Sequence, residues 1–278
     1  MNKTFYLLGA ALLMMAAGCT NPQEPKADAM VEESSFMASV KPLSEERQQH
    51  YPDNLEYPTA SADEDIITYM CYTSSYNHKT LCPNWVAYEL TREEASGTKS
   101  IDWSFGMDFS VKGRQASRED YSHSGWDRGH MAPRADMRWS EQAIKESYYF
   151  TNACPQNKEM NAGVWARLEG KARHAAKRFG SVYVVCGPIF TTGANGTIGR
   201  NKVKVPDAFF KALLAKTPKG YESIAFVIEN IEEDQSLKRC AMSVDDLEKQ
   251  LGRDLFFNME DKLEAAVESQ YDVKVWAL

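Results

Sequence analysis

Four adjacent residues, Asp127, Arg128, Gly129 and His130, are the part of the sequence whose side-chain types best suit phosphate chemistry. The ordinary pKa of histidine lies close to neutrality, so His130 can act as a general base. Arg128 can hold a phosphodiester through two parallel hydrogen bonds. We expect Gly129 to adopt a backbone conformation that other residues resist, and Asp127 to fix the loop by accepting backbone N–H bonds. A surface turn that exposes a histidine and an arginine would use the same residues, so both interpretations stay open at this point.

A second group of residues recurs at a spacing of four: Asn161, Trp165, Glu169 and Arg173. On a helix each step of four advances by about 40°, so all four share one broad face. Mg²⁺ prefers oxygen ligands and often takes only one or two protein groups. Asn161 and Glu169 therefore suit a single-metal phosphodiesterase in which His130 is the base. The alternative is a helix with an asparagine cap, a core tryptophan and a solvated Glu169–Arg173 pair.

The elements that would position these residues indicate an α+β fold around a mixed, mostly antiparallel central sheet. Aromatic and β-branched runs predict strands at 66–72, 85–90, 150–156, 181–190 and 221–230. Apolar periodicity and capping residues predict helices at 162–179 and 244–251, and a shorter helix after Ser140. Residues 73–84 are expected to form a turn, and residues 97–125 a long loop.

The N-terminal part of the chain is predicted to lie outside the folded domain. Lys3 and the apolar run that follows have the layout of a secretory signal, and we interpret residues 1–18 as a lipoprotein signal peptide with a lipid on Cys19. Residues 19–60 are rich in proline and acidic residues and would form a flexible tether. The catalytic domain is then 61–278. This predicts an exported lipoprotein, anchored to a membrane and facing the periplasm or the cell surface; a plain signal peptide is the alternative.

The distribution of charge and the cysteine spacing indicate which kinds of binding site the chain could hold. The chain carries a net charge of −7, yet residues 112–204 hold sixteen Lys and Arg against eight Asp and Glu. A basic centre in an acidic chain indicates a focused anion site.

In an oxidising compartment Cys71 and Cys82 could close a short disulfide loop. No Cys-x-x-Cys spacing occurs, which argues against a structural zinc site.

Five ordered blocks of the sequence resemble the DNA/RNA non-specific endonuclease family, which includes the Serratia nuclease and mitochondrial endonuclease G. They are YNHKTLCPNWVAYELT, DRGH, TN-x-x-PQ, N-x-x-x-W-x-x-LE and VYVVCGPIF. The resemblance implies a ββα-metal (His-Me finger) unit in which His130 is the general base and Asn161 is the direct ligand of one Mg²⁺, with Mn²⁺ as a substitute. It also implies that Glu169 orients metal-bound water and that Arg128 and Arg173 steady the phosphate.

The implied activity is hydrolysis of DNA and RNA to 5′-phosphate ends, with contacts to the phosphate backbone and no small-molecule cofactor. One departure concerns an additional phosphate-binding arginine of the family, expected shortly after the first hairpin. There the segment 98–103 offers only Lys99, with Arg114 further on. Two other functions remain open: a surface lipoprotein that binds polyanions without cutting them, and a phosphodiesterase that acts on another polymer.

Overall fold

The computed structural model describes residues 54–62 and 64–278. The predicted signal peptide, Cys19 and most of the predicted tether lie outside the described residues. The last residues of that tether, however, pack on the domain: Leu55 is buried in its core, and the Tyr57 hydroxyl lies 3.2 Å from Thr73 Oγ1. The folded part therefore begins before residue 61. No helix in the described part of the chain is long and apolar enough to cross a membrane.

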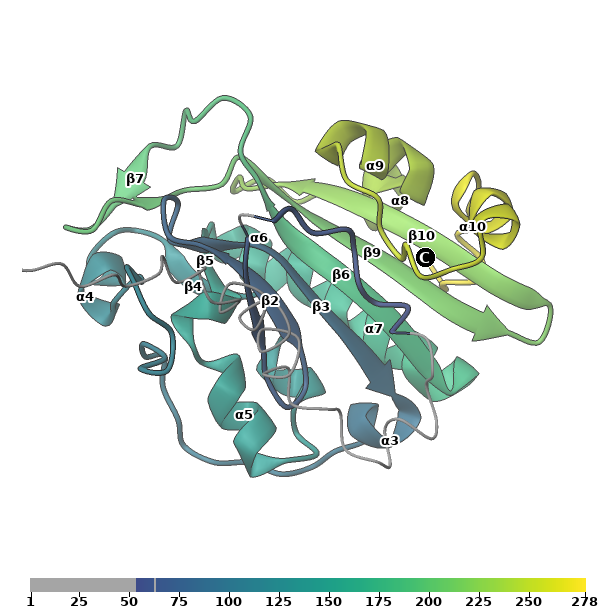
Figure 1. Ribbon diagram of the computed structural model, residues 1–278, viewed down its shortest axis with the longest axis horizontal. Coiled ribbons are helices and arrows are strands. Elements are labelled where there is room, and N and C mark those ends of the chain that lie inside the picture. Colours follow the sequence, from purple (N-terminus) through teal and green to yellow (C-terminus); the bar gives the residue numbers. More distant parts are fainter. Residues whose placement is uncertain (1–53, 63) are drawn as a thin grey trace, which may run out of the picture. The chain divides into compact units, whose positions relative to one another are not determined.

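A seven-stranded sheet forms the centre of the domain, in the order β1-β2-β3-β6-β9-β10-β11 (Figure 1). Its strands are β1 Asp65–Thr68, β2 Thr73–Asn77, β3 Cys82–Thr91, β6 Ser181–Ile189, β9 Ala208–Thr217, β10 Gly220–Glu229 and β11 Ala241–Met242. Every neighbouring pair is antiparallel. Two short ladders stand apart, β4 Asp127–His130 with β5 Ala153–Gln156 and β7 Thr197–Ile198 with β8 Val203–Lys204. The predicted α+β fold with a mostly antiparallel sheet is confirmed.

The helices are α3 Arg92–Ala95, α4 Arg118–Tyr121, α5 Glu141–Ser147, α6 Lys158–Met160, α7 Ala166–Phe179, α8 Leu237–Cys240, α9 Val244–Leu251 and α10 Asp261–Glu268. The predicted starts of α5 and α9 are confirmed by caps, since Ser140 Oγ accepts from Ala143 N and Ser243 Oγ accepts from Asp246 N. Helix α7 ends at Gly180, whose φ of 105° favours glycine.

The sheet separates two apolar cores because successive side chains of a strand point to opposite faces. Along β6, Val182 and Val184 belong to the core beneath α7, whereas Tyr183 and Val185 belong to the core beneath α9 and α10. Helix α7 contacts β6 and β9 on the first face, and α9 and α10 contact β10 on the other (Figure 1). The face under α7 is the one that carries the predicted catalytic residues.

Two local predictions are wrong. Residues 66–72 are not one strand, because the chain reverses after β1: Tyr69 N donates to Tyr72 O at 2.8 Å, and β2 occupies part of the expected turn. Cys71 and Cys82 do not form a disulfide. The Cys71 thiol lies against the Ala143 carbonyl, and the Cys82 thiol lies against the Lys204 carbonyl.

Candidate active site

The DRGH residues form a strand, not a turn. They make up β4, which pairs antiparallel with β5 so that His130 lies opposite Ala153. The chain then continues from β5 into one long helical segment made of α6, a π-helical turn at Asn161–Trp165, and α7. Two strands and a helix therefore bring the two polar groups of the sequence together (Figure 1). This is the arrangement that the ββα prediction requires.

His130 is held by aromatic rings. Its ring centre lies 4.6 Å from that of Phe105 and 4.9 Å from that of Tyr148. Its Nε2 is buried and accepts or donates no hydrogen bond among the described residues, so Nδ1 is the nitrogen left open to an entering water. Burial, with the nearby charge of Arg134, lowers the pKa of His130 to about 4. The imidazole is therefore neutral, and able to accept a proton, throughout the neutral range.

Gly129 is required for a reason other than the one expected. Its φ is not among the positive values of the chain, so its backbone is not strained. A Cβ at this position would instead lie 1.9 Å from Oε1 of Gln156, which is buried beside it. Glycine is needed here because the Gln156 side chain of the paired strand occupies the space above it.

Arg128 lies on the edge of the site with part of its guanidinium uncommitted. One terminal nitrogen donates to the Arg118 carbonyl at 3.3 Å, and the guanidinium carbon lies 5.8 Å from the centre of the Tyr121 ring. Its Nε is buried without a hydrogen-bond partner among the described residues. A planar cation that is positioned by a ring and a carbonyl, and still has free donors, is suited to bind a phosphate.

Asn161 and Asp127 form a fixed pair. Asn161 Nδ2 donates to Asp127 Oδ2 at 3.1 Å, so Asp127 orients a side-chain amide instead of the backbone N–H groups that the sequence suggested. No protein donor to Asn161 Oδ1 is found in the part of the chain that the structure describes. An uncharged oxygen, held in place and without a protein partner, fits a ligand of a hard cation such as Mg²⁺.

Glu169 and Arg173 are on the same helix face but do not form a solvated pair. Arg173 donates to Oδ1 of the fully buried Asp136 at 2.7 Å, and Asp136 Oδ2 accepts from the Tyr88 hydroxyl at 2.8 Å. Burial raises the pKa of Glu169 to about 7, although Lys211 and Arg173 act to lower it. The carboxyl of Glu169 can therefore exchange a proton near neutral pH when no metal is bound.

Several residues of the site were missed by the sequence analysis. Lys211 on β9 is fully buried, and its Nζ donates to the Met131 carbonyl at 3.4 Å. Arg134 donates to Ser100 Oγ at 3.0 Å, in the segment where only Lys99 was expected to supply a charge. Arg134 stands four residues after His130 in the sequence, but its proximity to His130 in space could not be inferred from that spacing.

Three other histidines of the described residues lie outside this site. His78 lies 2.9 Å from Asp65 Oδ2 and 2.7 Å from the Arg114 carbonyl, which makes it a structural residue of its loop. His123 and His174 are exposed. The three carboxylates whose oxygens lie within 4.8 Å of one another, Asp245, Glu248 and Glu268, belong to α9 and α10 and not to this site.

The chain is similar to named nucleases. It is 36% identical over 211 residues to the zebrafish (Danio rerio) protein named "Nuclease EXOG, mitochondrial", a match that spans 70% of this chain and 61% of that protein. It is 33% identical over 195 residues to human (Homo sapiens) "Endonuclease G, mitochondrial", over 65% of this chain and 66% of that protein. A solved structure of an EndoG/EndoGI complex matches with a TM-score of 0.67 at 25% identity, covering 75% of this chain and 91% of that one.

These relatives correct the predicted localisation. The zebrafish and human proteins are named as mitochondrial nucleases, so the prediction of an exported lipoprotein, anchored through a lipid on Cys19, is wrong. A basic residue followed by a short apolar run is a weak indicator of compartment when it is judged by composition alone.

A comparison of the whole domain with known protein families gives the same family as the five sequence blocks. The model of the DNA/RNA non-specific endonuclease family matches residues 52–265, which include β4, β5, α7 and the entire central sheet. The chain therefore belongs to the DNA/RNA non-specific endonuclease family.

Proposed function

We propose that this chain is a metal-dependent endonuclease that hydrolyses phosphodiester bonds in both DNA and RNA. The observation that carries the proposal is the state of His130, a neutral imidazole with one ring nitrogen open and no side-chain hydrogen bond to any residue that the structure describes. Such a group is ready to accept a proton from water. It stands on a two-strand unit whose following helix supplies Asn161 and Glu169.

The chemical step follows from these groups. His130 Nδ1 takes a proton from a water molecule, and the water oxygen forms a bond to phosphorus. The bond between phosphorus and the 3′-oxygen breaks on the opposite side, and the 3′-oxygen takes up a proton from solvent water, while His130 returns its proton to solvent. The products are a 5′-phosphate and a 3′-hydroxyl. Because the pKa of His130 is about 4, the base is available without prior deprotonation at neutral pH.

Asn161 Oδ1 would hold the metal, with Glu169 orienting a water bound to it, and Mg²⁺ fits this set of hard oxygen donors. When bound, the ion supplies a Lewis acid that stabilises the charge on the leaving oxygen. Asp127 contributes by fixing the Asn161 amide. We propose Mg²⁺ as the working ion, with Mn²⁺ able to replace it, and no small-molecule cofactor.

The phosphate would be held by arginines in unequal ways. Arg128 has free donors and can bind the phosphate directly. Arg173 is committed to Asp136, so it supports the developing charge from a fixed position. We propose that Arg134, whose charge already acts on His130, replaces the additional arginine that the segment 98–103 lacks.

The test uses the full chain with supercoiled plasmid and with single-stranded RNA, each in Mg²⁺ and in EDTA, beside His130→Ala. Loss of a general base typically lowers the rate about 10²- to 10⁴-fold. His174→Ala is the matched control, because His174 is an exposed histidine of α7. We expect cutting of both substrates in Mg²⁺, no cutting in EDTA, and loss of cutting only in His130→Ala.

The alternative of a polyanion-binding protein gives a different result. It predicts that the folded wild type retains DNA on a filter in EDTA and cuts neither substrate in any divalent ion. Equal cutting by the wild type and His130→Ala would instead show a nuclease whose base is another residue.

A further inference from the structure

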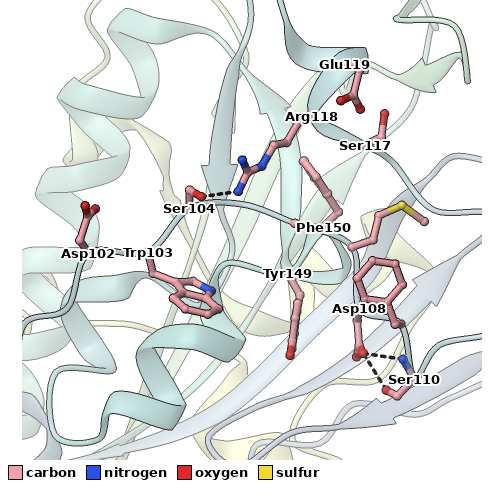
Figure 2. A pocket seen from close by; sticks show the side chains of 13 residues that line it. Asp102, Trp103, Ser104, Asp108, Ser110, Ser117, Arg118, Glu119, Tyr149 and Phe150 are labelled. Carbon is pink, nitrogen blue, oxygen red and sulfur yellow. Dashed lines mark hydrogen bonds between the residues drawn. The ribbon is translucent and has the colours of Figure 1, made fainter.

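A cavity of about 730 Å³ lies beside the catalytic strand, between the loop that precedes α4 and the start of the Phe150–Asn152 turn (Figure 2). Aromatic side chains line it, namely Trp103, Phe109, Tyr149 and Phe150, and Arg118 stands in its wall. The mechanism proposed above uses none of these side chains.

The loop side of this cavity exposes apolar rings to solvent. The side chains of Trp103 and Phe109 are 47% and 93% exposed, and Met107 between them is 36% exposed. Three large apolar residues within seven positions of one loop are therefore partly or almost wholly exposed, although the Lys145 ammonium lies 5.3 Å from the centre of the Trp103 ring. Exposed apolar clusters of this kind mark interaction sites.

The charges around the cavity do not suit a phosphate. Asp102, Asp108 and Glu119 contribute carboxylates to its lining, against the single lining cation Arg118. The Asp108 carboxylate already accepts from the Tyr69 hydroxyl and from Ser110, so Asp102 and Glu119 are the acceptors that remain for a ligand. Arg118 is already committed, since it donates to Ser104 Oγ (Figure 2) and also to the Phe105 carbonyl. An uncharged, flat group with amino donors on its edge fits these surroundings better than an anion does, because rings stack on its face and carboxylates accept from its edge.

The cavity adjoins the catalytic residues through two contacts. The Phe105 ring lies 4.6 Å from the His130 ring and 5.9 Å from the ring of Phe150, which lines the cavity. The Arg118 carbonyl accepts the hydrogen bond from Arg128. A phosphate held by Arg128 would therefore place a neighbouring part of the same nucleic acid strand at the mouth of this cavity.

We propose that this cavity binds an unpaired nucleobase of the substrate, stacked against Trp103 and Phe109, next to the phosphate that is cut. The inference rests on the proposed nuclease function. A base inside a duplex is paired and stacked, so it must be unpaired or extruded before it can enter. The enzyme should consequently favour single-stranded substrates and duplexes with frayed or mismatched positions.

The first test measures binding without catalysis. The full chain is titrated in EDTA into a single-stranded oligodeoxynucleotide that carries 2-aminopurine, and the same is done with the matching duplex. Stacking on a protein ring contributes roughly 1–3 kcal/mol per base, which is about 5- to 150-fold in affinity. We expect the double variant Trp103→Ala/Phe109→Ala to lose single-strand affinity by this factor, together with the change in 2-aminopurine fluorescence, and to keep most of its duplex affinity.

Phe257→Ala is the matched control, because Phe257 is 42% exposed and lies outside this cavity. The substituted side chains are exposed, so thermal unfolding should be unchanged and will verify the fold. Unchanged single-strand affinity in the double variant, or an equal loss on duplex and single strand, would overturn the proposal. Plasmid cutting in Mg²⁺ is measured on the same proteins, so that the two proposals can be judged separately. If the wild type cuts the plasmid but the double variant binds single strands as well as the wild type does, the proposed base site is refuted and the nuclease function is not.

Discussion

Lys211 offers the sharpest test of how the site is built, because it is a fully buried cation. Its Nζ donates to the Met131 carbonyl, next to His130, and lies 4.6 Å from the centre of the Trp165 ring. It also acts to lower the pKa of Glu169. Lys211→Met keeps a long, flexible side chain and removes only the charge and its donors. The cluster then loses a cation and is left with an excess of negative charge.

The magnitude follows from the proton equilibrium of Glu169. Its pKa is about 7 in the folded wild type and 4.5 in an unfolded chain, so the native state binds the proton more tightly. This carboxyl therefore makes the wild type less stable as the pH rises from about 4.5 to 7 and causes no further loss above that. In Lys211→Met the pKa of Glu169 is higher, so the loss continues above pH 7. At 1.36 kcal/mol per pH unit, the difference in unfolding free energy widens by up to about 1.4 kcal/mol between pH 6 and pH 8.

The assay is urea unfolding of the wild type and Lys211→Met at pH 6, 7 and 8, in EDTA so that no metal competes for the carboxyl. Lys216→Met is the matched control, because Lys216 is exposed on the same strand. It should change the unfolding free energy by less than about 0.5 kcal/mol at every pH. Asp136, the other carboxyl of the cluster, is paired with Arg173. Because Lys211 also acts to lower the pKa of Asp136, any contribution of this carboxyl in Lys211→Met has the same sign as that of Glu169. A difference between wild type and Lys211→Met that does not vary with pH would refute the reasoning.

Two further predictions test other parts of the chain. Asp127→Ala removes the acceptor that orients the Asn161 amide; we expect the Mg²⁺ concentration needed for half-maximal cutting to rise about 10- to 100-fold, and an unchanged midpoint would contradict the pairing. Glu268 is 1% exposed, and burial with the charge of Glu248 raises its pKa to about 9, so its ionisation costs stability as the pH rises from about 4.5 towards 9. Glu268→Gln should therefore raise the melting temperature more at pH 8 than at pH 5.5, and a uniform shift would show that another group titrates.

Features set by neighbouring residues could be predicted from the sequence. Ser140 and Ser243 were recognised as helix caps because a cap depends on residues two or three positions away. The spacing of four from Asn161 to Arg173 gave the helix face, and Trp165 is buried there as expected. The helical segment begins earlier than predicted, at Lys158, because Asn157 supplies the cap. Even the π-helical turn at Asn161–Trp165 leaves these residues on the side of β4, since Trp165 Nε1 donates to the His130 carbonyl.

Features set by residues far apart in the chain could not be predicted in this way. Lys211 stands in the run AFFKALLAKT, where nothing nearby indicates that a lysine is buried. Gly129 was assigned the right importance for the wrong reason, because the clash that excludes a larger residue comes from Gln156 on the paired strand. The reversal after β1 was missed because the hydrogen bond between Tyr69 and Tyr72 outweighs the continuous strand-forming composition.

These long-range contacts determine what the motif residues can do. Arg173 would be a mobile cation on an exposed helix face, but Asp136 fixes it. Glu169 would be an ordinary surface carboxylate, but burial moves its pKa to about 7 while Lys211 limits the rise. The same five sequence blocks on a chain without these partners would keep the ligand types and lose their protonation states and orientations. Activity in a related sequence should therefore depend on the residues at positions 136 and 211 as well as on the DRGH strand, although the side chains at both positions are fully buried.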